Sequence, residues 1–217
     1  MFMDFTIAIC ARIENNEHKM QLKRCIESIK THINLNEKTQ IVIVDSDSPD
    51  KSYIEEFRDG SNIFFENITN KNYEAGAWLH VYKNYLSKRY LFIQDSCWLV
   101  NRVDHLENVL VSVMYTHDSW EWATEYEIQW AKDSFTKTKW GKIPEPFTMI
   151  VGSMFYCQRI VFDDLYVNGT FNSLPINKSE SQAYERYIGA ALTAAGYQPY
   201  ILETPRLPLQ KLYLRRQ

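Results

Sequence analysis

Short apolar runs alternate with amphipathic segments along the first half of the chain. Apolar runs of four to eight residues are typical of buried strands, whereas apolar residues that recur every three or four positions predict one face of a helix. On this basis strands are expected at 5–11, 41–44, 62–65 and in the YLFI part of 88–100, and helices at 22–33, 49–57 and 75–86. Alternation of strands and helices predicts a mostly parallel sheet that is covered on both faces, a three-layer α/β/α arrangement.

The second half of the chain has a less regular pattern. Four tryptophans stand among charged residues in 101–147, and we interpret this segment as a loop-rich lid. A further strand is expected at 149–156. Ser179 and Gln182 have the spacing of a capping box that opens a helix, Gly196 closes that helix, and 200–203 reads as a last strand. Because neither a repeat nor a linker divides the sequence, one domain over 1–217 is expected.

Charge and cysteine content exclude several classes of protein. The 24 Lys and Arg are spread among 27 Asp and Glu, for a net charge of -3, so the chain has no overall field that favours nucleic acid. The four cysteines lack a C-x-x-C pair, which disfavours a zinc site or a disulfide framework and suits a reducing, cytoplasmic compartment. No apolar stretch is long enough for a transmembrane helix. The basic ending LQKLYLRRQ is compatible with peripheral membrane contact, although a solvated end is the more ordinary interpretation.

Carboxylates stand where two of the expected strands end. Asp45 follows the strand at 41–44, and Asp95 follows YLFI. In open α/β sheets, ligands bind at the carboxyl ends of strands. An acid at that edge can accept hydrogen bonds from a base or ribose, or can hold a divalent cation. The structural alternative is that Asp47 or Asp50 caps the helix expected from Ser48 and Pro49, and that Asp95 bonds its own loop.

The order of motifs resembles the family 2 type of nucleotide-sugar glycosyltransferases, which have the GT-A fold. The resemblance covers most of the chain. It is carried by TIAICARIENNEHKMQLKRCIESI, by VDSDSPD in the place of V-D-D-G-S-T-D, by Asn72 and Gly76, by NGTF (168–171), by Tyr184-Glu185-Arg186 in the place of an E-D pair, and by Gly196-Tyr197. Each motif alone is only moderately specific, and their shared order strengthens the assignment.

The resemblance implies transfer of a sugar from a nucleoside-diphosphate donor to a hydroxyl of a carbohydrate or glycoconjugate, with inversion. Residues 1–100 would form the nucleotide-binding half and 101–217 the acceptor half. Glu185 would be the catalytic base that deprotonates the acceptor hydroxyl. The donor site would comprise Ala11, Arg12, Asp45, Asp47, Asn72, Gly76, Asp95 and Ser96. Glu185 could equally be a solvated residue beside an apolar helix stripe.

One segment departs from the family pattern. Where the family has a D-x-D that binds Mg²⁺ or Mn²⁺, this chain has Gln94-Asp95-Ser96-Cys97. Asp95 is then the one expected metal ligand, and a requirement for Mn²⁺ or Mg²⁺ stays open, because Arg and Lys side chains or helix N-termini can also neutralise a diphosphate. Arg12, Lys71 and Arg159 are candidates for that role. Trp98 is a candidate for stacking on a sugar, against the more ordinary interpretation of a packing residue.

Two other classes compete with the transferase. The string IVIVDSDS also fits a phosphatase of the haloacid dehalogenase type, with Asp45 as nucleophile, Asp47 as acid/base, and Asp163 and Asp164 as the magnesium pair. Against it, a full strand and helix precede the motif. The incomplete D-x-D raises the second alternative, a non-catalytic carbohydrate-binding protein with a degenerate transferase fold.

Overall fold

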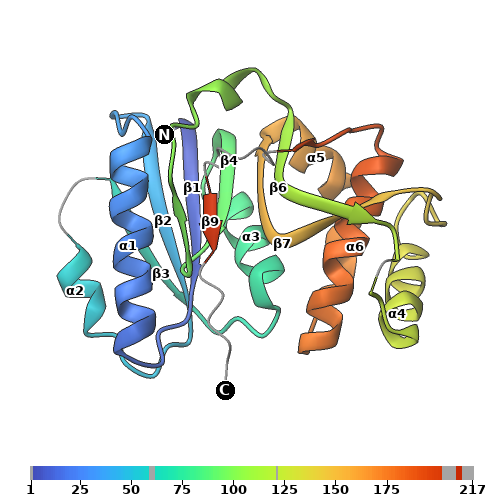
Figure 1. Cartoon of the computed structure of the whole chain (residues 1–217), viewed down its shortest axis with the longest axis horizontal. Coiled ribbons are helices and arrows are strands. Elements are labelled where there is room, and N and C mark those ends of the chain that lie inside the picture. The colour runs from blue at the N-terminus through green and yellow to red at the C-terminus, as the bar shows by residue number, and fades with distance from the viewer. Residues whose placement is uncertain (1, 59–61, 121, 202–208, 212–217) are drawn as a thin grey trace.

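The computed structural model describes residues 2–58, 62–120, 122–201 and 209–211. A seven-stranded sheet in the order β3-β2-β1-β4-β7-β6-β8 forms the centre of the molecule (Figure 1). Its strands are β1 (Met3–Ala11), β2 (Thr39–Ser46), β3 (Ile63–Ile68), β4 (Ser87–Gln94), β6 (Val111–Asp118), β7 (Thr148–Gln158) and β8 (Tyr200–Ile201). A separate two-stranded sheet pairs β5 (Cys97–Leu99) with β9 (Leu209–Lys211). The α-helices among the described residues are α1 (Asn16–His32), α2 (Tyr53–Phe57), α3 (Tyr73–Asn84), α4 (Glu125–Phe135), α5 (Arg159–Val167) and α6 (Lys178–Ala194), and short 3-10 turns lie at Asp104–Asn108 and Thr170–Asn172.

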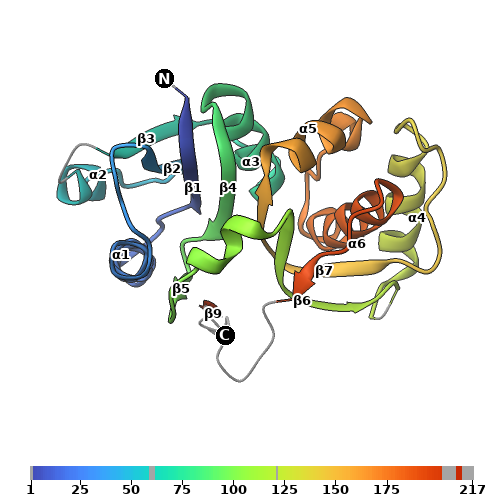
Figure 2. The same cartoon turned by 90° about the horizontal axis from the view of Figure 1, so that it is seen from above.

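Alternate residues of the parallel strands pack on opposite faces of the sheet. In β1, Phe5, Ile7 and Ile9 contact the cluster that includes the apolar side of α1, whereas Ala8 contacts the cluster that includes α3, α5 and α6. Figure 2 shows α1 and α2 on one side of the sheet and α3, α5 and α6 on the other. The expected three-layer α/β/α arrangement is therefore confirmed. Coverage of both faces accounts for the uninterrupted apolar runs within β2 (41–44) and β4 (90–93).

The sheet has a topological switch point between β1 and β4. The chain passes from β1 outward through β2 to β3, and then returns to place β4 on the other side of β1. These four strands are mutually parallel. In open α/β sheets, ligands bind at the carboxyl ends of the strands next to such a switch point. Here the segments after β1 and β4 continue on the same face of the sheet, where β5 packs in the same apolar cluster as α1.

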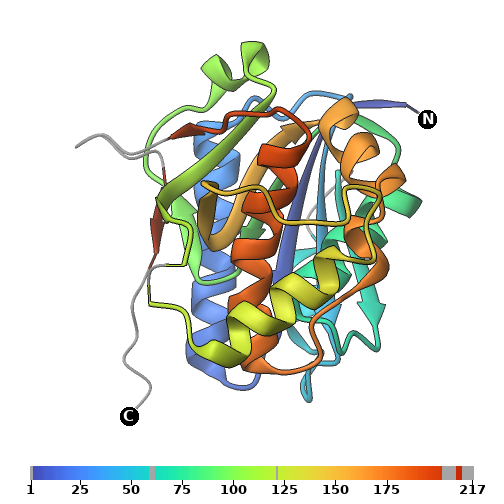
Figure 3. The same cartoon turned by 90° about the vertical axis from the view of Figure 1, so that its right-hand side faces the viewer.

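The second half extends the sheet with antiparallel pairing. β7 is antiparallel to both β4 and β6, and β8 is parallel to β6. The interpretation of 101–147 as a loop-rich lid was wrong in part, because this segment contains β6 and α4. A complete capping box between Thr124 and Glu127 opens α4. In Figure 3, α4 crosses in front of α6, and the two helices cover the same side of the sheet.

Two of the expected helix starts also differ. The helix after β2 begins at Tyr53 rather than at Pro49. At the start of α6, Asn177 is the N-cap and its side chain accepts from the Glu180 amide, so the predicted capping box at Ser179 is not formed. The end of α6 is as expected: Gly196 adopts φ +81°, and the Tyr197 amide donates to the Leu192 carbonyl. Of the expected strand at 200–203, positions 202 and 203 lie outside the described residues.

Candidate functional site

The residues singled out at the ends of strands meet at one edge of the sheet. Ala11 pairs with Asp45 across β1 and β2, and Cys10 pairs with Gln94 across β1 and β4. The Asp95 amide donates to the Cys10 carbonyl at 3.1 Å. In Figure 1 this is the lower edge, where the loop leading into α1 and the N-terminus of α6 also lie. The residues that were singled out at strand ends therefore lie together beside the switch point, and their role as a site stays a prediction.

Asp45 is fully buried, and both of its oxygens accept hydrogen bonds from this chain. Oδ1 accepts from the Ser48 amide at 2.7 Å, and Oδ2 accepts from the Tyr53 hydroxyl. The Ser48 hydroxyl in turn accepts from the Ile13 amide at 2.7 Å. Asp45 thus joins the loops that follow β1 and β2. Because neither Asp45 nor its partner Tyr53 is exposed, a nucleoside could contact this carboxylate only after the surrounding groups moved.

Asp47 has the backbone conformation of a glycine. Its φ is +60°, a region that residues with a Cβ adopt at a cost, and its side chain is exposed. The position is the one at which the resembled family has Gly. Neither Asp47 nor Asp50 is the N-cap of α2, which is Ser52. Asp50 accepts from the Ser52 amide at 2.8 Å, and this bond holds the pKa of Asp50 below its usual value.

Asn70 organises the start of α3. Its Oδ1 accepts from the Asn72 amide at 2.9 Å, and its Nδ2 donates to the Ser46 hydroxyl at 3.1 Å. A Cβ on Gly76 would lie 2.1 Å from Asn70 Oδ1, so the backbone of α3 can come this close to the Asn70 side chain only with glycine at position 76. The Asn72 side chain donates to the Pro175 carbonyl at 3.2 Å and thereby contacts the segment before α6. Asn72 and Gly76 thus shape the loop next to the switch point.

Asp95 lies in the turn between β4 and β5. Its Oδ2 accepts from the Arg12 amide at 3.2 Å, and the side chain is half-buried. Burial raises the pKa of Asp95 to about 6, against the lowering effect of hydrogen bonds from the Arg12 and Ser96 amides. The Arg12 guanidinium points to solvent, where it pairs with Glu14 at 3.2 Å. Asp95 is therefore a carboxylate whose charge is costly until a cation or donor group offsets it.

Glu74 is a site residue that the sequence reasoning missed. It lies in the first turn of α3, half-buried, and its Oε1 accepts from Gln94 Nε2 at 2.5 Å. The Ser181 hydroxyl of α6 lies 3.5 Å from Oε2. The charge of Glu74 further raises the pKa of Asp95 and of the Cys10 thiol, after the larger effect of desolvation. The available signal was an acid in the first turn of a helix that follows Asn72, next to a strand ending in Gln94.

Glu185 lies on the row of α6 that faces this region. Ser181, Glu185 and Gly189 are spaced by four residues and therefore share one side of the helix. Ser181 contacts Glu74 at one end of the row, and at the other end a Cβ on Gly189 would lie 2.1 Å from the Thr148 carbonyl of β7. Glu185 stands between them and is half-buried. Glu185 is therefore partly exposed on the same side of α6 as Ser181 and Gly189, and its role stays a prediction.

The remaining candidates are placed as follows. Ser96 follows Asp95 in the turn, and its amide donates to the Asp95 carboxylate. Trp98 lies in β5, and the Arg24 guanidinium covers its ring at 3.7 Å from the centroid. Arg159 bonds to the Tyr90 hydroxyl at 2.8 Å, near the start of β4 and so away from the edge that carries Asp95. Within the described ranges, no three His, Cys, Asp or Glu side chains converge as a metal-binding group.

The structure separates the residues that a phosphatase would require. Asp163 and Asp164 lie on α5, which follows the end of β7 that pairs with Arg89 near the start of β4. Asp45 lies at the opposite edge, past the end of β2. The two acids already have partners: Asp163 accepts from the Tyr82 hydroxyl at 2.5 Å, and Asp164 accepts from the Tyr197 hydroxyl. The haloacid dehalogenase assignment of these residues was therefore wrong.

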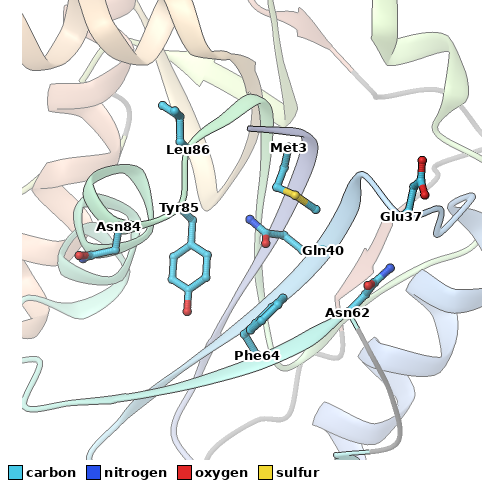
Figure 4. A pocket seen from close by; sticks show the side chains of 8 residues that line it. All are labelled: Met3, Glu37, Gln40, Asn62, Phe64, Asn84, Tyr85 and Leu86. Atoms are coloured by element: carbon cyan, nitrogen blue, oxygen red, sulfur yellow. The ribbon is translucent and has the colours of Figure 1, made fainter. Parts of the chain in front are cut away.

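A cavity of about 380 Å³ lies at the other edge of the sheet (Figure 4). It is lined by Met3, Glu37, Gln40, Asn62, Phe64, Asn84, Tyr85 and Leu86. These residues come from the starts of β1, β2 and β4 and from the chain around the start of β3 and the end of α3, so the cavity is remote from Asp95. None of the residues singled out from the sequence lines it.

Comparison with solved structures identifies the fold. TarS from S. aureus, in a structure of residues 1–349 with UDP, superimposes with a TM-score of 0.52 at 11% identity over 88% of this chain and 55% of the TarS chain. GalNAc-T7, in a structure with UDP, GalNAc and Mn²⁺, gives a TM-score of 0.55 at 14% identity over 85% of this chain and 40% of its own. The chain has the GT-A fold.

The similarity to these proteins is seen in the structure and not in the amino-acid sequence. No family model matches the sequence, and no curated protein matches it either. The chain spans about half the length of the solved chains that it resembles. No helix among the described residues has the length and apolar character needed to cross a membrane. Of the basic ending, Leu209–Lys211 form β9, and 212–217 lie outside the described residues.

Proposed function

We propose that this chain is a glycosyltransferase of the family 2 type, which moves a sugar from a nucleoside diphosphate to a hydroxyl group of a carbohydrate or glycoconjugate. The observation that carries the proposal is the placement of Asp95, Glu74 and the Ser181–Glu185 face of α6 around the switch point of a GT-A fold. Solved proteins of this fold were crystallised with UDP, with GalNAc and with Mn²⁺. The order of sequence motifs supports the same function independently.

In the proposed reaction Glu185 is the general base. Its carboxylate takes the proton of the acceptor hydroxyl as the oxygen forms a bond to the anomeric carbon. The bond between that carbon and the donor phosphate oxygen breaks, and the nucleoside diphosphate leaves with the electron pair. Attack on the face opposite the leaving group inverts the configuration. The half-burial of Glu185 supports this role, because a partly shielded base restricts the orientations in which an acceptor hydroxyl can approach it.

The donor side of the site is made by the loops after β1, β2 and β4. Ala11 and Arg12 lie beside Asp95. Asn70 bonds both the end of β2 and the Asn72 amide, and Asp47 and Asn72 therefore lie on either side of this connection. Asp95 would hold a divalent cation together with the donor diphosphate, because Mg²⁺ and Mn²⁺ accept one carboxylate plus phosphate oxygens and water. Such a cation supplies positive charge that stabilises the leaving diphosphate. The hydrogen bonds that the Asp95 carboxylate accepts from backbone amides hold it in place for that role.

Glu185→Gln tests the assignment of the base. Release of nucleoside diphosphate from a panel of nucleotide sugars would be measured with and without mixed saccharide acceptors and Mn²⁺. The variant should bind the donor as the native protein does and transfer at least about a hundredfold more slowly. A transfer rate equal to that of the native protein would remove Glu185 from the mechanism. Absence of release with every donor in the native protein would favour a non-catalytic binding protein.

A further inference from the structure

One carboxylate of α3 accepts hydrogen bonds from two other elements of the site. Glu74 accepts from Gln94, the last residue of β4, through Oε1 at 2.5 Å, and from Ser181 of α6 through Oε2 at 3.5 Å. Gln94 immediately precedes Asp95 on the donor side, and Ser181 lies one turn before Glu185 on the acceptor side. A single side chain therefore connects the elements that carry the two sets of proposed functional groups.

We propose that Glu74 is a positioning residue, which fixes the Gln94–Asp95 turn relative to the first turn of α6. This inference rests on the proposed function of the site. The carboxylate acts through its two partners rather than on the substrate itself. Transfer requires the reacting atoms to be aligned to within a few tenths of an ångström, and an error of about 1 Å can cost on the order of a hundredfold in rate. A side chain that bonds Gln94 at 2.5 Å and also contacts Ser181 at 3.5 Å serves that alignment.

Glutamine at position 94 has the donor that the hydrogen bond to Glu74 requires. A carboxamide donates to a carboxylate, whereas an acid at 94 would place a second negative charge 2.5 Å from Glu74. Gln94 and Glu74 therefore form a matched donor and acceptor at the segment where the sequence departs from D-x-D. Because Asp95 is next in the chain, a shift of the Gln94 side chain is transmitted directly to the turn that contains Asp95.

The same two segments are joined by a second bond. Asn72, two residues before Glu74, donates to the Pro175 carbonyl at 3.2 Å. Glu180 secures the start of α6 through its bonds with the Ile176 amide at 2.8 Å and the Asn177 side chain at 2.9 Å. Both ends of the Glu74–Ser181 contact therefore belong to fixed backbone. Glu74 itself is at a helix N-terminus, where the helix dipole favours a carboxylate.

The experiment combines Glu74→Ala with a swap of the bonded pair. Glu74→Ala, Gln94→Glu and the double variant Glu74→Gln/Gln94→Glu would be assayed for transfer rate and, by calorimetry, for affinity toward UDP and GDP. Glu125→Ala is the matched control, because Glu125 also lies in the first turn of a helix but is exposed. Melting temperature and circular dichroism would be recorded for each variant, and the swap carries the test if Glu74→Ala does not fold.

We expect Glu74→Ala to lower kcat at least about tenfold while nucleotide affinity changes less than about threefold. Gln94→Glu should lose a similar factor in kcat. The double variant should recover most of the kcat that Gln94→Glu loses, because the donor then lies at position 74 and the acceptor at position 94. A swap no better than Gln94→Glu, an unchanged kcat in Glu74→Ala, or an equal loss of affinity and kcat would overturn the inference. A native protein that binds no nucleotide would instead refute the proposed function.

Discussion

Asp95 should make the protein less stable as pH rises, and Asp95→Asn should remove that loss. The pKa of Asp95 is about 6 in the folded protein, against 3.8 for an ordinary Asp, with burial as the main cause. A folded-state pKa above the unfolded value means that the folded protein binds the proton more tightly. The contribution is therefore fully present below about pH 4 and is lost as pH rises through about 6.

The magnitude follows from the difference between the two pKa values. Each unit corresponds to about 1.36 kcal/mol, so a difference of about two units gives about 3 kcal/mol, which we reduce to about 2 kcal/mol because the side chain is partly exposed. Asn keeps an oxygen that accepts from the Arg12 amide. For a chain of this size, about 2 kcal/mol corresponds to a rise in Tm of roughly 4 to 8 °C at pH 8.

The assay is urea unfolding at pH 4, 6 and 8 for the native protein and for Asp95→Asn. The two should have similar stability at pH 4 and diverge as pH rises, with the variant more stable at pH 8. Asp50→Asn is the control: the Ser52 amide holds the pKa of Asp50 below its usual value, so its contribution is lost only below the pH range of the assay, and this variant should keep the native pH profile between pH 4 and 8. Parallel pH profiles for the native protein and Asp95→Asn, or a variant less stable at pH 8, would refute the reasoning.

Three further changes test the loops around the site. Gly76→Ala should lower stability by about 1 to 3 kcal/mol in urea unfolding, because its Cβ would lie 2.1 Å from Asn70 Oδ1; unchanged stability would contradict the close approach. Tyr53→Phe should lower stability by about 1 to 3 kcal/mol, since the buried Asp45 carboxylate loses a donor, and a neutral result would mean that water replaces the hydroxyl. Asp47→Gly should raise stability or leave it unchanged, because glycine adopts φ +60° without strain; a loss of more than about 1 kcal/mol would show that the Asp47 side chain holds the loop.

Strands β1, β2 and β4 were predictable because burial on both faces leaves an unbroken apolar run within each of them. The segment 101–147 was not, and α4 shows the reason. Its buried positions include Glu127 and Ser134, whereas Tyr126 is 52% exposed. Glu127 tolerates burial because it completes the capping box and lies 3.9 Å from Arg186. Apolar periodicity fails wherever polar residues are buried as partners of one another.

The parts of the candidate site that follow strand ends were predictable from the sequence. The parts that depend on contacts between residues distant in the sequence were not. Asp45 and Asp95 stand directly after apolar runs, so their edge of the sheet followed from the pattern. Glu74 and Ser181 are 107 residues apart, and no local pattern reports that they meet. The burial of Asp45 under Tyr53 was equally invisible, because it depends on where α2 begins.

The central claim is that the switch point between β1 and β4 binds a nucleotide sugar. The most direct test is the thermal shift of the native protein with UDP, GDP, ADP, CDP and dTDP and with their sugars, each with and without Mn²⁺. A ligand that binds only the folded state stabilises it by about 2.7 kcal/mol at a hundred times its Kd. The account predicts a rise in Tm that is selective for one base. Equal Tm values with every nucleotide, in a folded sample, would contradict it.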